Sequence, residues 1–138
     1  MFFISHKFEI SMRLKNFSLS IGSQIFKACS DESRLRILSL IFQNKEMCIS
    51  DLEQILDFTQ TKTSRHLIYL KNSGILVTRK MDQWVFYSLK EEVLEIIGQI
   101  FEFLSRDQIL KNDTEVFKTM YSNRELALNK FEHKNWMN

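Results

Sequence analysis

The sequence of 138 residues contains no proline and only three glycines, Gly22, Gly74 and Gly98. Proline and glycine interrupt helices most strongly, so their scarcity favours long helices joined by few tight turns. No apolar run approaches the roughly 18 residues that a membrane span needs. The apolar start Met1–Ile4 lacks the basic flank and the cleavage site of a signal peptide. We therefore expect a cytoplasmic protein with no membrane segment.

Cysteine is scarce as well. Cys29 and Cys48 are too few for a disulfide scaffold and fit a reducing compartment. They leave two interpretations open. One is a pair that responds to oxidation; the other is two buried thiols that pack as small apolar side chains, which is the commoner fate of a free cysteine. We favour the buried thiols.

Acidic residues are absent from one long segment. Residues 58–81 carry five basic side chains and no acidic one, whereas residues 91–117 carry seven acidic side chains and two basic ones. The net charge is only +2, so the overall charge does not point to nucleic acid. The separation of basic from acidic residues along the chain does point to nucleic acid. A surface that faces phosphates is basic, whereas the remote surface is free to be acidic.

The first part of the chain predicts two helices after a loose tail at residues 1–13, where Met12 is an alternative start. Apolar residues recur at helical spacing from Leu14 onward. A second helix follows, with Ser30 or Asp31 as its N-cap. Asp31 begins a charged first turn that suits the helix dipole.

A helix-turn-helix pattern follows at residues 50–72. Ser50 and Glu53 have the spacing of a capping box, in which each side chain would bond the other's backbone N–H, and they predict a short helix to about residue 56. Thr59 is placed to cap the next helix, which ends near Asn72. Gly74 then supplies a left-handed C-terminal cap. Two short helices across a tight turn are typical of this DNA-binding motif.

Strand-forming residues lie on both sides of this motif. Residues 75–80 and 84–89 are rich in β-branched and aromatic side chains and predict a hairpin, with Asp82 as the left-handed residue of its turn. Residues 46–49 predict a minor strand. A hairpin directly after a helix-turn-helix is a wing, so the predicted fold is mainly α with a small β-hairpin wing: a winged helix-turn-helix.

The helix predicted from Glu91 to Leu104 is apolar on more than one face, which favours burial against a second subunit. A last helix is predicted from Asp113, as its N-cap, to about Phe131. We divide the chain into the tail, a DNA-binding and dimerisation domain at residues 14–106, and a helical extension at residues 107–138. The predicted homodimer contacts come from the first and fifth helices: Phe17, Ile21, Ile25, Val93, Ile97, Ile100, Phe101 and Leu104.

The outer face of the helix at residues 59–72 carries the side chains that contact DNA. Arg65 can bond guanine or phosphate, and Gln60 can bond adenine. Lys62 suits a phosphate near the helix start. The wing tip adds phosphate or minor-groove contacts, while Trp84, Phe86 and Tyr87 pack inward. The predicted DNA-binding set is Gln60, Thr61, Lys62, Ser64, Arg65, His66, Arg79, Lys80 and Gln83.

Five segments, in order and spacing, resemble the ArsR/SmtB family of bacterial repressors over residues 14–104. They are residues 26–38, 46–52, 59–67, 74–77 and 83–89. The resemblance implies an obligate homodimer that binds double-stranded DNA at a near-palindromic operator and releases it when an inducer binds. It also implies DNA contacts at the positions of Gln60, Thr61, Ser64, Arg65 and His66.

The metal sites of that family are incomplete in this sequence. Where the family has Glu-Leu-Cys-Val-Cys-Asp-Leu, this chain has Glu46–Leu52 with Cys48 as the only thiol, and Ser50 replaces the second. A second family site uses histidine on the dimer helix, and residues 91–104 contain none. Soft metals need converging thiolates and zinc needs about four ligands, so we predict no metal site, no cofactor and an inducer of another kind.

Two rival functions were weighed. An enzyme is excluded because the neighbours Ser64, Arg65 and His66 diverge by 100° per residue on a helix and cannot form a nucleophile–base pair. A winged helix that binds proteins instead of DNA is the stronger rival, since fold does not fix function. The acid-free segment at residues 58–81 favours DNA, because a pure interaction module has no need of it.

Overall fold

The computed structural model of the protein describes residues 17–127 and 129–130. The predicted tail, the alternative start at Met12 and the helix start at Leu14 lie outside these residues. The described helices agree in order with the predicted ones, and the fold class is confirmed. They are α2 (Leu19–Ala28), α3 (Glu32–Asn44), α4 (Ile49–Leu56), α5 (Gln60–Asn72), the short 3₁₀ helix η1 (Glu91–Val93), α6 (Leu94–Phe103) and α7 (Gln108–Ser122).

A small antiparallel sheet has the strand order β1-β3-β2. Its strands are β1 (Glu46–Cys48), β2 (Leu76–Met81) and β3 (Trp84–Leu89). β2 and β3 form the predicted hairpin, in which Met81 pairs with Trp84 across a two-residue turn. Asp82 has the predicted left-handed backbone, with φ 54°. We call the β2–β3 hairpin the wing.

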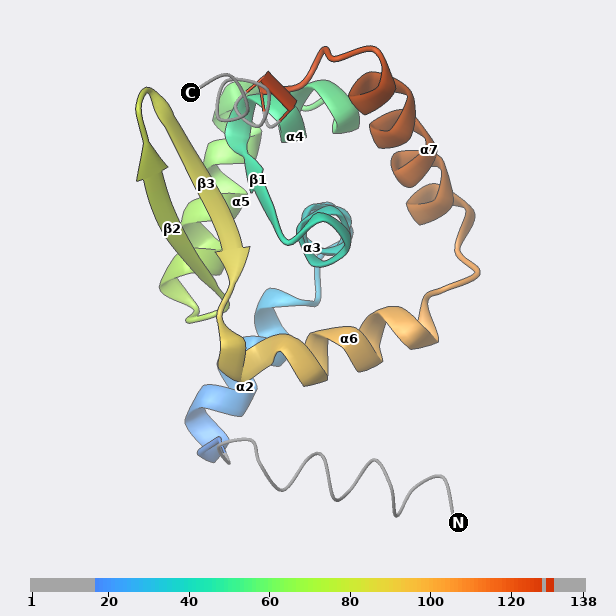
Figure 1. Ribbon diagram of the computed structural model, residues 1–138. Helices are drawn as coiled ribbons and strands as arrows, with labels where there is room; N and C mark the ends of the chain where they lie inside the picture. The colour runs from blue at the N-terminus through green and yellow to red at the C-terminus, as the bar shows by residue number, and fades with distance from the viewer. Residues whose placement is uncertain (1–16, 128, 131–138) are drawn as a thin grey trace.

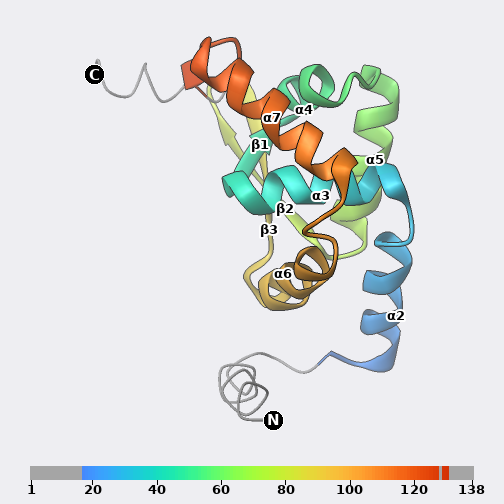
Figure 2. The ribbon, with the colours of Figure 1, turned by 90° about the vertical axis from the view of Figure 1, so that its right-hand side faces the viewer.

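Helix α3 is the centre of the molecule, and the other elements surround it (Figures 1 and 2). It contacts the sheet and helices α4, α5, α6 and α7. Four of its apolar side chains are fully buried: Ile37, Leu38, Leu40 and Ile41. The wing and α5 lie on one side of α3 and α7 on the opposite side, while α2 and α6 lie at the same end.

The N-caps of α3 and α5 are as predicted. Asp31 accepts a hydrogen bond from the Arg34 N–H at 3.0 Å, which selects it over Ser30. Thr59 accepts one from the Lys62 N–H at 3.1 Å. Each satisfies a backbone donor that has no partner within the helix.

The predicted capping box at Ser50 is wrong. Helix α4 begins at Ile49, directly after β1, and its N-cap is Cys48, which is extended and paired with Phe86 of β3. Ser50 therefore lies inside the helix, where its Oγ is 3.3 Å from the Cys48 Sγ. Glu53 Oε1 is buried and accepts no hydrogen bond from any described residue.

The predicted cap at Asp113 is also wrong. Asp107 caps α7 instead and accepts a hydrogen bond from the Leu110 N–H at 3.0 Å. Asp113 lies within α7, only 4% exposed, and accepts two hydrogen bonds from Arg36 of α3 at 2.9 and 2.8 Å. None of the described helices is long and apolar enough to cross a membrane.

Candidate nucleic-acid interface

Helix α5 is held firmly by its inner face and by both ends. Thr63, Leu67 and Leu70 are fully buried, as their spacing predicts. At the C-terminal end the Gly74 N–H donates to the Lys71 carbonyl and the Ile75 N–H donates to the Leu70 carbonyl, each at 3.1 Å. This is a Schellman motif, and it requires the left-handed Gly74 backbone, φ 82°. The outer face of α5 is therefore presented on a rigid helix.

A shallow hollow of about 460 Å³ lies on the outer face of α5. Four predicted DNA-contacting residues line it together: Gln60, Thr61, Ser64 and Arg65. The fifth lining residue is Ile68, whose side chain is 54% exposed. Sequence reasoning missed Ile68, although its spacing of four residues from Ser64 places it on the same face.

Lys62 and Tyr69 lie at the edges of this face and contact neighbouring elements. The Lys62 Nζ is 4.0 Å from the centre of the Phe58 ring, so the ammonium is held over the turn that precedes α5. The Arg34 guanidinium of α3 lies 4.2 Å from the centre of the Tyr69 ring and covers it. Lys62 remains partly exposed beside the start of α5, where a phosphate contact was predicted.

His66 is placed differently from its neighbours in the predicted set. It is only 6% exposed and faces the start of α3, near Asp31 and Arg34. Burial lowers the pKa of its imidazole, and the Arg34 charge acts in the same direction, while the Asp31 carboxylate opposes them. The side chain therefore packs neutral against α3, which leaves little of it to reach a base.

The three wing residues that were predicted to contact DNA lie in two different environments. Arg79 lies in the middle of β2 and pairs with Glu46 of β1, with one N–O distance of 2.6 Å. That hydrogen bond raises the pKa of Arg79. Lys80 and Gln83 are exposed near the turn. Phe86 is fully buried and Trp84 and Tyr87 are partly buried, as predicted.

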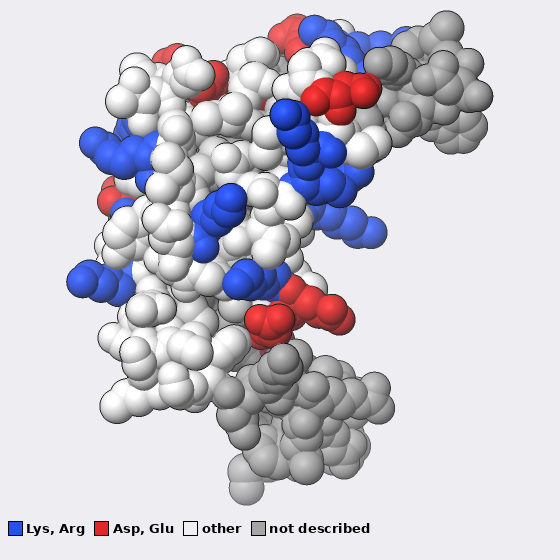
Figure 3. Space-filling model, turned by 90° about the vertical axis from the view of Figure 1, so that its left-hand side faces the viewer, with Lys and Arg blue, Asp and Glu red and all other residues white. Residues whose placement is uncertain are grey.

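Basic side chains spread over the middle of the side that carries the wing, and fewer acidic side chains lie on it, at the top, the lower right and the left edge (Figure 3). The sequence segment 58–81, which has no acidic residue, forms α5 and β2 on this side. The surface near the hollow is thus suited to a polyanion.

The predicted dimer residues divide into core and surface. Ile25, Val93 and Ile97 are at most 1% exposed within one chain, so they belong to its own core. Ile21 is 45% exposed. The remaining four are partly buried: Phe17, Ile100, Phe101 and Leu104. Sequence reasoning missed the large apolar side chains that α2 and α6 expose: Leu19 (91%), Phe26 (61%), Leu94 (43%) and Phe103 (89%).

Both cysteines are free thiols. Burial raises the pKa of Cys29 and of Cys48, so both stay protonated at neutral pH, the form that reacts slowly with oxidants. Within residues 17–127 and 129–130, no three His, Cys, Asp or Glu residues cluster closely enough to hold a metal ion.

A family model described as "Bacterial regulatory protein, arsR family" matches residues 31–77, from the start of α3 to the start of the wing. The arsenic resistance transcriptional regulator ArsR2 of Pseudomonas putida is 42% identical over 78 residues, which are 56% of this chain and 68% of that protein. The chain belongs to the ArsR family. This is a family of transcriptional regulators, not of enzymes.

One further relative and one solved structure are similar to this ArsR-family chain. The arsenical resistance operon repressor of Escherichia coli is 44% identical over 76 residues, 55% of this chain, and the match spans just under two thirds (65%) of that protein. The solved structure of HlyU from Vibrio cholerae has a TM-score of 0.59 and 31% identity, and it covers 63% of this chain and 95% of its own. More than a third of this chain lies outside that match.

Proposed function

We propose that this ArsR-family chain is a transcriptional repressor that binds a near-palindromic DNA operator as a homodimer. The hollow on α5 carries the proposal. Gln60, Thr61, Ser64 and Arg65 present amide, hydroxyl and guanidinium groups together on one exposed helix face. These groups match the donors and acceptors of base edges and phosphates in the major groove. Lys80 and Gln83 extend the contact beside the groove.

The exposed apolar side chains of α2 and α6 support the homodimer. Leu19 and Phe103 are about nine-tenths exposed in a single chain, and both helices lie at one end of the molecule (Figures 1 and 2). Such large apolar surfaces mark contact sites in soluble proteins. A twofold dimer would carry two copies of α5, which is the reason that the operator is near-palindromic.

The inducer is proposed to be neither a metal nor an oxidant. The relatives in Escherichia coli and Pseudomonas putida are named for arsenic resistance. In this chain Ser50 hydrogen bonds to the Cys48 thiol at the position where a second thiolate would be needed. The raised pKa of both thiols also disfavours a redox response.

Fluorescence anisotropy of a labelled duplex tests the proposed function. The duplex is taken from DNA upstream of the gene and compared with a shuffled sequence of the same composition. We expect specific binding in 50 mM salt and an affinity that falls by about a thousandfold by 200 mM, because contacts to phosphates release counterions. Absence of binding to either duplex in 50 mM salt would contradict the proposal.

A further inference from the structure

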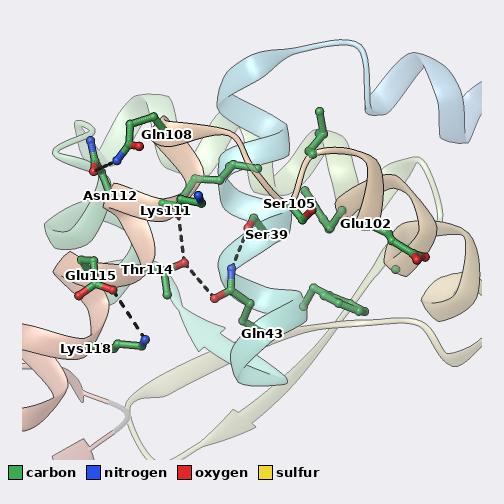
Figure 4. A pocket seen from close by; sticks show the side chains of 15 residues that line it. Ser39, Gln43, Glu102, Ser105, Gln108, Lys111, Asn112, Thr114, Glu115 and Lys118 are labelled. Carbon is green, nitrogen blue, oxygen red and sulfur yellow. Dashed lines mark hydrogen bonds and ion pairs between the residues drawn. The ribbon is translucent and has the colours of Figure 1, made fainter.

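Helices α3, α6 and α7 line an open cleft of about 720 Å³ (Figure 4), and α7 lies on the opposite side of α3 from the wing (Figure 1). This volume is typical of sites for small organic molecules. α7 forms one wall, and it lies outside residues 31–77, which match the family model. The cleft is thus a feature of this chain beyond the helix-turn-helix.

One side of the cleft is aromatic. The rings of Phe42 and Phe101 lie 6.0 Å apart between their centres. Gly98 of α6 makes room for the Phe42 ring, since a Cβ atom at this position would lie 3.2 Å from the Phe42 Cζ. The absence of a side chain at Gly98 therefore lets the Phe42 ring lie against α6 and shape the floor of the cleft.

The opposite side is polar and ordered by hydrogen bonds (Figure 4). The Gln43 amide donates to the Ser39 hydroxyl at 2.9 Å and accepts from the Thr114 hydroxyl at 3.0 Å. Lys111 also lines the cleft and forms no ion pair with any residue that the structure describes. Of the two carboxylates in the lining, Glu115 pairs with Lys118 at 3.7 Å, and Glu102 lies at the far end of the cleft from Lys111 (Figure 4). An aromatic floor beside hydroxyl groups and the Lys111 ammonium suits a small aromatic molecule that carries a carboxylate.

Helix α7 links this cleft to the helix-turn-helix. Asp113 of α7 holds Arg36 of α3 through two hydrogen bonds. Beyond α7, the Ala127 N–H donates at 2.7 Å to Asp51 of α4, whose side chain is fully buried, and Leu126 beside it is fully buried too. α4 packs directly on α5. α7 and the residues after it thus contact both the cleft and α4, and they connect the cleft to the helix-turn-helix.

We propose that the α3–α6–α7 cleft is the effector site of the repressor, that it takes a small aromatic acid, and that its occupation weakens DNA binding through α7 and α4. The proposal rests on the proposed function and deepens it, because it assigns the regulation of the same DNA-binding surface. The coupling requires that the effector bind more tightly to the form of the protein that has the lower affinity for DNA.

A tethered ring tests this site without knowledge of the natural effector. In a background with Cys29→Ser and Cys48→Ala, Ser105→Cys at the mouth of the cleft is labelled with N-phenylmaleimide. Thr119→Cys, on an exposed position of α7 that does not line the cleft, is the matched control. We expect the label at position 105 to weaken operator binding about tenfold, a typical coupling, while the label at position 119 leaves it unchanged.

Equal DNA affinity of the labelled and unlabelled Ser105→Cys proteins would overturn the proposal. A change in the mass of the assembly on labelling would also overturn it, because the cleft would then be a contact between copies. The unlabelled variants distinguish failure of the effector site from failure of the proposed function. If they and the wild type bind no DNA, the proposed function fails instead.

A different observation carries a second inference. Ile68 is 54% exposed in the middle of an otherwise polar face, beside Ser64 and Arg65. The apolar group that the major groove offers is the C5 methyl of thymine, which side chains recognise by apolar contact. We infer that Ile68 contacts a thymine methyl in each half of the operator. This inference also rests on the proposed function.

Replacement of single thymines by deoxyuridine tests the contact, because it removes only the methyl group. Operators selected from random duplexes are substituted at one thymine per half-site. For the wild type we expect about a fourfold loss of affinity at one position, the value of a buried methyl group. Ile68→Ala should be insensitive at that position, and Ile109→Ala, an equally exposed isoleucine on α7, should behave as the wild type.

A wild type that tolerates deoxyuridine at every thymine would overturn the role of Ile68. The same loss in Ile68→Ala as in the wild type would overturn it too. Both results presuppose a measured affinity for the unsubstituted operator, so they leave the proposed DNA-binding function intact.

Discussion

At the scale of single residues, the neighbours Arg65 and His66 have opposite environments. Arg65 is exposed on the hollow of α5, whereas His66 is buried against the start of α3. Helical geometry predicts the outward direction of Arg65 from the sequence alone. It does not predict the burial of His66, because the covering residues Asp31 and Arg34 come from a helix about thirty positions earlier in the chain.

The buried His66 makes the stability of the fold depend on pH. Because burial lowers its pKa, the folded protein binds a proton less readily than the unfolded chain does. Neutral His66 makes its full contribution to the unfolding free energy above the pKa of histidine in the unfolded chain, about 6.5. That contribution is lost as the pH falls below this value. Denaturant titrations at pH 7.5 and 5.5 should show a larger fall in unfolding free energy for the wild type than for His66→Gln. Equal falls would contradict this burial effect.

At the scale of elements, local signals decided which predictions were right. Thr59 and Gly74 bracket α5 through contacts with their own chain neighbours, so both ends were predictable. The predictions of N-caps at Ser50 and Asp113 were wrong because residues distant in the sequence determine where these two helices begin. β1 stays extended through its pairing with β3, and Asp113 is drawn inward by Arg36. A local sequence pattern does not show contacts between residues that are distant in the chain.

The cap of α5 can be tested with two matched substitutions. Gly74→Ala places a Cβ in a left-handed backbone, although no heavy atom lies within 4 Å of it, so the cost is conformational. We expect the unfolding free energy to fall by about 1–2 kcal/mol. Gly22→Ala within α2 also meets open space and should raise it by up to about 1 kcal/mol, because alanine favours helix. Calorimetry that shows equal changes would contradict the role of Gly74.

At the scale of the whole molecule, the sequence indicated that the helix containing α6 is apolar on more than one face, but it did not indicate which face is exposed. The structure shows that Ile97 fills the core of the chain while Phe103 is exposed. Which face of α6 is buried depends on where α3 packs against it, and the spacing of apolar residues in the sequence does not show this. The division of the chain at residue 106 stays a prediction.

The proposed dimer should depend on Phe103. Phe103→Glu removes two apolar side chains from a twofold interface, one per chain, and should weaken dimerisation by about 3–6 kcal/mol. Light scattering after gel filtration should then report a monomer. Ile109→Glu, on the exposed surface of α7, is the control and should remain a dimer. If both variants remain dimers, Phe103 does not lie in the dimer interface, and the prediction is contradicted.

If the outer face of α5 binds the operator, Arg65→Ala should weaken that binding. Arg106→Ala, an exposed arginine between α6 and α7, removes the same charge away from this face. Fluorescence anisotropy with the selected operator should give an affinity about 1–3 kcal/mol weaker for Arg65→Ala, which is roughly 5- to 150-fold, and an unchanged affinity for Arg106→Ala. Operator affinity of Arg65→Ala equal to that of the wild type would contradict the account.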